Sequence, residues 1–304
     1  MMRLILSTNN ITCQNLSSLQ KPNSELSESE LSKALRYKFQ DTQDKFRYLN
    51  LLNIFRTGDL QTLSHVPGLT LEHLSGYYIP RADISTSPLA EQRSQYEITV
   101  KIFYLSEKDL RSKEYANDAI RFVLQKLDVE YIDLLIASFP NRLSNGETGK
   151  ENEDFSEEDI EENVATWTEL TLLQEKGIVK RLGVADFNNN KLGKFLKRVK
   201  VRPQVNQMNL KNYCKITPSM QELARLEKIE LLTHRDSRNM LQNFSLSEIL
   251  KQDNEDTNLS SHNDQSLDNV NNILSSKWVA KYTAVVRDRG VIEYKGYFVA
   301  IELL

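Results

Sequence analysis

The sequence predicts an α/β fold in which parallel strands alternate with crossover helices. Residues 131–137 form an apolar run that ends shortly before Pro140, as expected for a strand buried on both faces. The segments on either side of this run, 115–127 and Val164 to Gly177, have the apolar spacing of amphipathic helices. Strand-like segments recur after the later helices, and this order favours parallel strands joined by helices.

A closed barrel and an open doubly wound sheet both fit this order. No GxGxxG motif follows any predicted strand, which disfavours a dinucleotide-binding sheet. The other elements follow from the same periodicities. The further strands are predicted at 3–6, 96–104, 178–185, 204–208 and 229–233, and the further helices at 28–56, 190–199 and 218–226. Gly290 and Gly296 are predicted to mark turns around a short strand or hairpin.

Two stretches without periodicity are predicted to be flexible inserts. Residues 141–163 carry glycines and a dense acidic run, and residues 251–276 are rich in Asn, Asp and Ser. The last part of the first insert is a candidate start of the following helix, with Ser156 as its N-cap. The chain is otherwise predicted to form one domain over residues 1–304.

Composition limits the classes of function. The chain has 304 residues, of which 39% are hydrophobic, and a net charge of −3, so one large core is expected and neither nucleic acid nor an anionic membrane is a favoured partner. Cys13 and Cys214 form no CxxC motif, so we expect no zinc site and no disulfide scaffold. No apolar run approaches a membrane span. We therefore expect a cytoplasmic protein without a bound metal.

Three blocks in the middle of the chain occur in the order found in the aldo-keto reductase family. They are Tyr131–Pro140, then Trp167 to Phe187, then Pro203–Gln207. Together they resemble that family over roughly residues 96–235. The resemblance implies a (β/α)₈ barrel of the TIM type.

The same resemblance implies hydride chemistry that this sequence is not equipped to perform. The family uses an Asp, a Tyr, a Lys and a His, and Lys101 matches its lysine. The chain has no Asp-x4-Tyr pair, and Ser138 stands at the position of the histidine. Losing the general acid costs about 10²–10⁴-fold in rate. Asp186 and His234 also replace the Asn and Tyr that contact the nicotinamide, so we expect neither catalysis nor a cofactor.

A closer resemblance includes the tail of the chain. The residues that carry this resemblance are Asn206–Leu210, Cys214, Pro218, Ile229–His234, Trp278 and Val286–Tyr297. In these residues the chain resembles the family of modifier subunits of glutamate–cysteine ligase. Members of that family bind the catalytic subunit, raise its apparent affinity for glutamate and relax its feedback inhibition by glutathione. The resemblance implies a heterodimer with the catalytic subunit. The candidate partner contacts are Asn209, Cys214, Arg289, Lys295 and Tyr297.

Alternatives remain open for the residues of the expected vestigial pocket: Lys101, Ser138, Asp186, Gln207 and His234. Lys101 is expected to be an interior lysine paired with a carboxylate, and Asp186 and Gln207 to satisfy loop backbone. An active NADPH-dependent reductase would need a replacement acid, for which His234 and Tyr104 are the candidates. A third alternative is a module that binds NADPH without turnover.

Three further features have a functional and a plain interpretation. Cys214 is either an intersubunit disulfide partner or, as we expect, a buried reduced thiol. The acidic run 151–162 and the basic stripe Lys191–Arg202 are expected to be solvated surfaces rather than docking sites.

Overall fold

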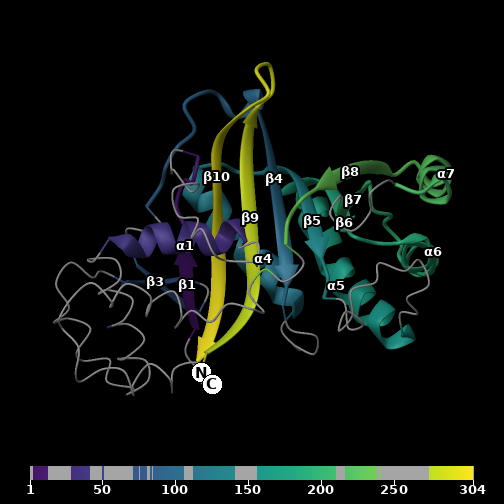
Figure 1. The fold of residues 1–304 in the computed structure, drawn as a ribbon, viewed down its shortest axis with the longest axis horizontal. Coiled ribbons are helices and arrows are strands. Elements are labelled where there is room, and N and C mark those ends of the chain that lie inside the picture. Colours follow the sequence, from purple (N-terminus) through teal and green to yellow (C-terminus); the bar gives the residue numbers. More distant parts are fainter. Residues whose placement is uncertain are drawn as a thin grey trace, which may run out of the picture. The chain divides into compact units, whose positions relative to one another are not determined.

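The computed structural model divides into two compact units (Figure 1). Unit 1 comprises Met1–Ser85, Ser237–Lys277 and Lys295–Leu304, and unit 2 comprises Thr86–Asp236 and Trp278–Tyr294. The structure describes residues 3–12, 29–41, 50, 71–74, 76–80, 83, 85–105, 112–140, 156–209, 216–237, 240 and 274–303. Both cysteines, residues 141–155 and residues 251–273 lie outside these ranges, so the expectations for them are untested.

Unit 2 is built on a sheet with the strand order β9-β4-β5-β6-β7-β8 (Figure 1). The five strands from β4 to β8 run parallel, and β9 is antiparallel to β4. Their bounds are β4 Tyr96–Tyr104, β5 Ile132–Ser138, β6 Val179–Ala185, β7 Val205–Asn209, β8 Glu230–His234 and β9 Leu274–Val286. The parallel order predicted from the sequence is therefore present.

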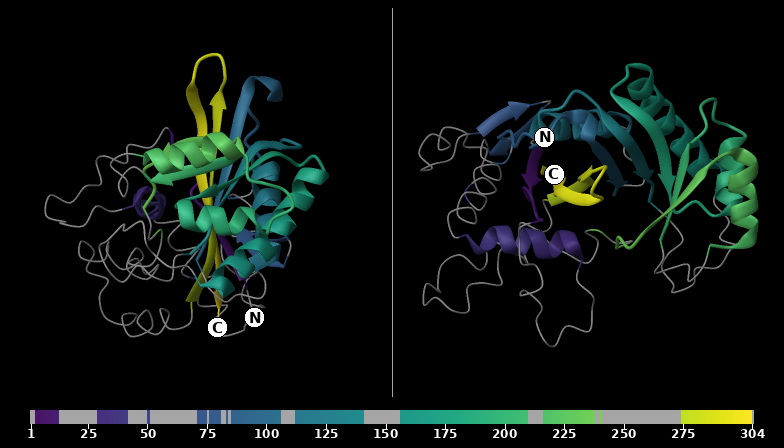
Figure 2. Two further views of the ribbon diagram at one scale, coloured as in Figure 1. Left: turned by 90° about the vertical axis from the view of Figure 1, so that its right-hand side faces the viewer. Right: turned by 90° about the horizontal axis from the view of Figure 1, so that it is seen from above.

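Four helices join the parallel strands and line the outer face of the curved sheet (Figure 2). They are α4 Ser112–Leu127, α5 Glu157–Glu175, α6 Asn189–Leu196 and α7 Pro218–Glu227. A short 3₁₀ helix, Arg93–Gln95, precedes β4.

The helix ends follow local sequence signals. The Ser156 side chain accepts a hydrogen bond from Asp159 N, and the Asp159 carboxylate accepts one from Ser156 N, which is a capping box. Thr217 caps α7 and Pro218 occupies its first turn, where the missing N–H costs nothing. Gly177 follows α5 with φ +73°, the left-handed conformation that ends many helices.

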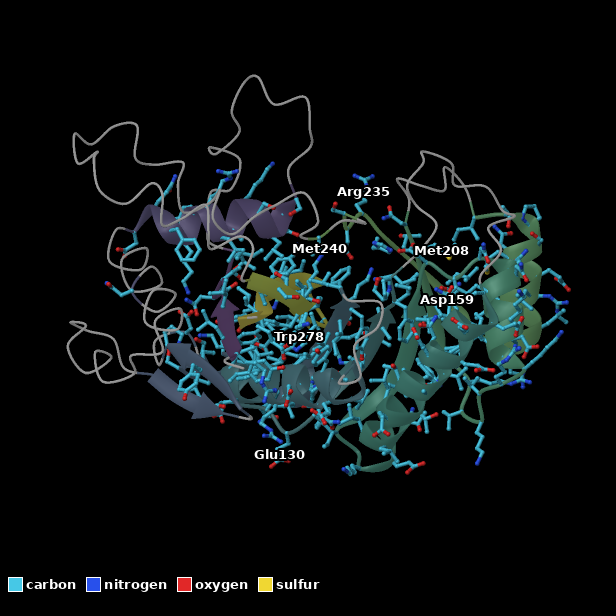
Figure 3. All side chains as sticks on the ribbon, turned by 90° about the horizontal axis from the view of Figure 1, so that it is seen from below. Glu130, Asp159, Met208, Arg235, Met240 and Trp278 are labelled. Carbon is cyan, nitrogen blue, oxygen red and sulfur yellow. The ribbon has the colours of Figure 1, made fainter. Side chains whose placement is uncertain are left out.

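The core of unit 2 lies between the sheet and its helices. Trp167 of α5 packs edge-on against Phe195 of α6, with ring centroids 5.5 Å apart. Trp278 of β9 is fully buried among side chains of the core (Figure 3). Asn206 of β7 is also fully buried, and its side chain is satisfied because it donates to Phe187 O at 2.8 Å. This contact fixes the loop that follows β6.

In unit 1 the strands are hydrogen-bonded in the order β2-β3-β1-β10. The bounds are β1 Arg3–Ser7, β2 Leu71–Leu74, β3 Tyr77–Pro80 and β10 Val291–Leu303, and helix α1 spans Glu30–Gln40. β1 pairs antiparallel with β10, from Arg3 opposite Glu302 to Ser7 opposite Phe298. Lys38 of α1 is tied to the strands because its ammonium donates to Ser7 O at 2.7 Å and to Asp83 at 2.5 Å.

The structure corrects three predicted boundaries. Gly296 was predicted to mark a turn, but it lies within β10, whereas Gly290 does occupy the turn before β10 with φ +63°. Strand β9 begins at Leu274, inside the predicted insert 251–276. Helix α5 begins at Glu157, so the last residues of the predicted insert 141–163 belong to the helix that Ser156 caps. Tertiary strand pairing and capping extend elements beyond their periodic segments.

No helix among the described residues is long and apolar enough to cross a membrane.

Candidate functional site

Polar side chains gather in unit 2 at the carboxyl ends of the parallel strands. Asp186 directly follows β6, Asn209 ends β7 and His234 ends β8. In (β/α) barrels, catalytic and binding groups come from this end of the strands. The gathered residues, called the Lys101 cluster below, are Lys101, Asp186, Asn209, His234, Asp236 and Lys281.

Asp236 joins the two lysines of the Lys101 cluster. Its Oδ2 accepts from Lys101 Nζ at 3.0 Å, and its Oδ1 accepts from Lys281 Nζ at 2.6 Å. Lys101 of β4 and Lys281 of β9 face each other in the antiparallel register. The Lys101 and Asp236 side chains are 4% and 8% exposed, so this is a buried ion pair. Lys101 is thus an interior lysine paired with a carboxylate, as the sequence predicted.

His234 lies between two carboxylates. Its Nε2 is 3.2 Å from both oxygens of Asp186, and its Nδ1 accepts from the backbone N–H of Asp236 at 3.1 Å. In the neutral ring the proton is therefore on Nε2 and points to Asp186. When the ring is protonated, Nδ1–H also faces the Asp236 carboxylate, which is 3.2 Å away.

Asn209 holds the two carboxylate segments in place. Its backbone N–H donates to Asp186 Oδ1 at 2.8 Å, and its side-chain amide donates to Asp236 O at 2.9 Å. Asp186 itself has φ +59°, which places its carboxylate back toward β7 and β8. Arg235, between His234 and Asp236 in sequence, is exposed and points away from β8 (Figure 3).

The cluster changes the acidity of its members. Burial lowers the pKa of Lys101 below its ordinary value, although Asp236 and Asp186 oppose this. Burial acts to raise the pKa of Asp236, but the hydrogen bond from His234 and the charges of the two lysines outweigh it, and the pKa is lowered. Burial acts to lower the pKa of His234, but the hydrogen bonds to Asp186 and Asp236 outweigh it, and the pKa is raised.

The other pocket residues predicted from the sequence lie nearby without joining these contacts. Ser138 ends β5 and is partly exposed. Gln207 lies in β7, and its buried Oε1 has no hydrogen-bond partner among the described residues. Tyr104 lies three positions beyond Lys101 in β4, and therefore on the opposite face of that strand. Its buried hydroxyl has no hydrogen-bond partner in the part of the chain that the structure describes, and burial raises its pKa above the ordinary value.

The predicted partner contacts fall in both units. Asn209 is 1% exposed and belongs to the Lys101 cluster. Arg289, in the exposed turn between β9 and β10, forms an ion pair with Glu91. In unit 1, Lys295 Nζ lies 2.5 Å from Glu30 Oε1, and the Tyr297 hydroxyl donates to Glu30 Oε2 at 2.9 Å. These two residues fasten β10 to the start of α1. Cys214 lies outside the described residues.

Two members of the Lys101 cluster were missed by sequence reasoning. Asp236 lies three residues beyond the predicted parallel strand 229–233, where polar side chains commonly serve a site, so its position was a usable signal. Lys281 gave no such signal, because only the pairing of β9 with β4 brings it opposite Lys101.

The described residues of the cluster do not fit a nicotinamide cofactor. The Lys101 ammonium is neutralised by Asp236, and the Asp186 carboxylate is engaged by His234 and by the Asn209 N–H. The ionised carboxylates of Asp186 and Asp236 also offer no donor to an amide oxygen. Gln207 Oε1 is one acceptor open to an amide donor, which alone does not make a nicotinamide site. Within the described ranges, no group of three or more His, Cys, Asp and Glu residues is suited to a metal ion.

Comparison with known proteins relates the chain to two sets of relatives. The putative glutamate–cysteine ligase regulatory subunit of Schizosaccharomyces pombe is 25% identical over 68% of this chain and 72% of its own length. The glutamate–cysteine ligase regulatory subunit of Homo sapiens is 26% identical over 68% of this chain and 66% of its own length. A Bombyx mori aldo-keto reductase solved in complex with NADP has 20% identity and a TM-score of 0.32, over 49% of this chain and 42% of that one.

The profile of one protein family also matches the chain. It is described as the aldo/keto reductase family, and it covers residues 72–292 of the 304. The match confirms the predicted fold class, a (β/α) barrel of the aldo-keto reductase kind, to which the parallel strands β4 to β8 and their helices belong. Since the profile covers more than half of the sequence, the chain belongs to the aldo/keto reductase family.

Proposed function

We propose that this chain is a non-catalytic regulatory subunit of glutamate–cysteine ligase. The observation that carries the proposal is the similarity to regulatory subunits of that enzyme over 68% of the chain. The Lys101 cluster is consistent with it, because Lys101 is committed to Asp236 and no tyrosine hydroxyl lies among its contacts in the described residues. A carbonyl substrate would therefore find no proton donor beside the lysine.

The chain acts by binding the catalytic subunit as a heterodimer in the cytoplasm. Binding energy alters the partner only if the chain binds one state of it more tightly than another. The favoured state is the one that binds glutamate well and glutathione poorly. Thermodynamic linkage then requires glutamate to strengthen the association of the two subunits by the same factor, and glutathione to weaken it.

The test is the glutamate dependence of γ-glutamylcysteine synthesis by the catalytic subunit, with and without an excess of this chain. A lower apparent KM for glutamate, or weaker inhibition by glutathione, is the expected result. The matched control is the same titration with heat-denatured chain. Unchanged kinetics together with separate elution of the two proteins in size-exclusion chromatography reject the proposal.

Membership of a reductase family favours a second candidate, an NADPH-binding protein with or without turnover. Intrinsic fluorescence of the chain titrated with NADPH distinguishes the candidates. A reductase shows quenching and consumption of NADPH with a carbonyl substrate, and a sensor shows saturable quenching without consumption. We expect neither, because the cluster residues that would face a nicotinamide are bound to one another.

A further inference from the structure

One nitrogen of the His234 ring faces two different groups of Asp236. Nδ1 lies 3.1 Å from the backbone N of Asp236 and 3.2 Å from its carboxylate oxygen Oδ2. The first group is a hydrogen-bond donor, and the second is a negatively charged acceptor. A ring nitrogen with a lone pair binds only the donor, whereas a ring nitrogen with a proton binds only the acceptor. The protonation state of His234 therefore decides which group of Asp236 the ring holds.

The neutral ring holds the backbone of Asp236. Nε2 carries the proton toward Asp186, which leaves the Nδ1 lone pair to accept from the Asp236 N–H. That lone pair repels the Asp236 carboxylate, whose Oδ2 is 3.2 Å away. Lys101 and Lys281 keep the carboxylate in place, because they donate to its two oxygens at 3.0 and 2.6 Å. In this state the ring fixes the backbone of residue 236 and the lysines fix its side chain.

Protonation of the ring reverses its two contacts with Asp236. Nδ1–H then faces the Asp236 N–H, so this backbone donor loses its acceptor. Nδ1–H donates instead to the Asp236 carboxylate, and a charge-assisted hydrogen bond is stronger than the neutral one that it replaces. Oδ2 also accepts from Lys101, so the two cations then share one oxygen. The peptide group before Asp236 is released from the ring while the carboxylate is drawn toward it.

The charged groups around the ring come from four segments of unit 2. Lys101 lies on β4, Lys281 on β9, Asp186 after β6 and Asp236 after β8, and the N–H of Asn209 at the end of β7 binds Asp186. With a neutral ring, two ammonium groups meet two carboxylates, and protonation adds one positive charge. Burial acts to lower the pKa of the ring, and so does the charge of Lys101, but the hydrogen bonds to Asp186 and Asp236 outweigh them and the pKa is raised.

The residue between His234 and Asp236 lies on the surface. Arg235 is exposed and points away from β8 (Figure 3). A rotation of the peptide group that joins Arg235 to Asp236 changes the backbone angles of both residues, so the exposed guanidinium moves with it. Asp236 is also the last residue before the chain passes from unit 2 into unit 1. A change at the buried ring therefore reaches an exposed cation and the segment that follows β8.

We propose that His234 and Asp236 form a proton-operated switch that repositions residues 235–237. The neutral ring holds the Asp236 backbone, and the protonated ring releases that backbone and holds the carboxylate. Two arrangements of one pair of residues, of which the proton favours one, are the elements of a pH-sensitive switch. The inference concerns the chain alone and goes beyond the proposed function, because it requires no partner.

The test follows the full chain by nuclear magnetic resonance from about pH 5 to pH 8. The ¹⁵N shifts of the His234 ring report which nitrogens carry protons. We expect a proton on Nε2 alone at high pH and on both nitrogens at low pH, with a midpoint above 6.5. Protection of the Asp236 amide from hydrogen exchange, corrected for the intrinsic rate, should fall about three- to tenfold in the protonated state. A nearby charge without a switch would shift the amide signal and leave its protection unchanged.

Two variants separate the switch from other pH effects. His234→Gln removes the titrating ring, so the pH-dependent loss of Asp236 protection should disappear. Asp186→Asn removes the carboxylate from Nε2 and leaves Nδ1 facing Asp236, so the midpoints of the ring and of the Asp236 protection should fall together by about one pH unit or more. Thermal unfolding at both ends of the range checks that each variant is folded, and the wild-type protection decides the question if one is not.

Three results would each overturn the switch. The first is equal protection of the Asp236 amide in the two states of the wild type. The second is a loss of protection in His234→Gln that matches the wild type. The third is a neutral ring with its proton on Nδ1, because that nitrogen would then have no lone pair for the Asp236 N–H.

Discussion

Asp236 is the residue on which the Lys101 cluster depends, because its two oxygens face two different lysines. The buried Lys101 has been moved out of water and Lys281 only partly, and the ion pair with Asp236 is what offsets that loss. The family resemblance placed Lys101 in a vestigial pocket, and the sequence predicted an interior lysine paired with a carboxylate. The geometry identifies that carboxylate as Asp236.

Replacing Asp236 tests this interpretation. Asp236→Asn leaves two ammonium groups facing an uncharged amide, so we expect a loss of about 3–5 kcal/mol in the free energy of unfolding. The measurement is urea denaturation followed by circular dichroism. The matched control is Glu230→Gln, which removes the exposed ion pair with Arg181 and is expected to cost no more than about 1 kcal/mol. Equal losses in the two variants would show that Asp236 is not a buried ionic partner.

His234 makes stability depend on pH near neutrality. Its folded-state pKa is raised above the ordinary 6.5, so its protonated form stabilises the fold. That contribution is complete below pH 6.5 and is lost as the pH rises through the folded-state pKa. We expect the free energy of unfolding of the wild type to fall over this range and that of His234→Gln to change less. Parallel pH profiles of the two proteins would contradict the assignment.

At the scale of the elements, the close approach of β6 and β7 depends on a glycine. A Cβ added at Gly183 would lie 2.8 Å from Val205 Cβ and 3.0 Å from Val205 O, distances at which atoms overlap. The two residues are partners in the parallel register. Strand β6 therefore needs Gly183 to keep β7, and with it Asn209 and Gln207, in place.

Two glycine substitutions should change stability in opposite directions. Gly183→Ala forces β6 and β7 apart and is expected to destabilise the protein by about 1–3 kcal/mol. Gly193→Ala adds a Cβ with nothing within 4 Å, in the interior of helix α6, and is expected to stabilise it by up to about 1 kcal/mol. Thermal unfolding of both variants against the wild type is the measurement. A stabilised Gly183→Ala would mean that the strands are not this close.

At the scale of the whole molecule, the two ends of the parallel sheet carry different charged groups. The carboxyl end holds the Lys101 cluster, whose polar groups are largely bound to one another. The amino end holds Asp133 and the exposed cations around it.

Carboxylates at both ends of the parallel sheet should make the free energy of unfolding sensitive to acid. Burial acts to raise the pKa of Asp133, but the Ile98 N–H and Arg93 outweigh it, and the pKa is lowered, as for Asp236. Carboxylates with lowered pKa stabilise the fold above their ordinary value of 3.8, and this contribution is lost as the pH falls through the folded-state pKa. We expect stability to drop below about pH 4 in denaturant titrations, and to drop less in Asp133→Asn. The control is Glu230→Gln, an exposed carboxylate. A wild type as stable at pH 2 as at pH 5 would contradict this.

The sequence by itself determined the alternation of strands and helices from β4 to β8, because periodicity and caps are local properties of the chain. It also indicated that Lys101 lacks the catalytic tyrosine and pairs with a carboxylate. Only the tertiary structure decided which carboxylate that is, since Lys101 and Asp236 are 135 positions apart. It alone placed β9 against β4 and brought Arg93, Lys180 and Arg287 to Asp133. Pairing between distant strands depends on competition among many possible partners in the folded protein, and no local pattern specifies its outcome.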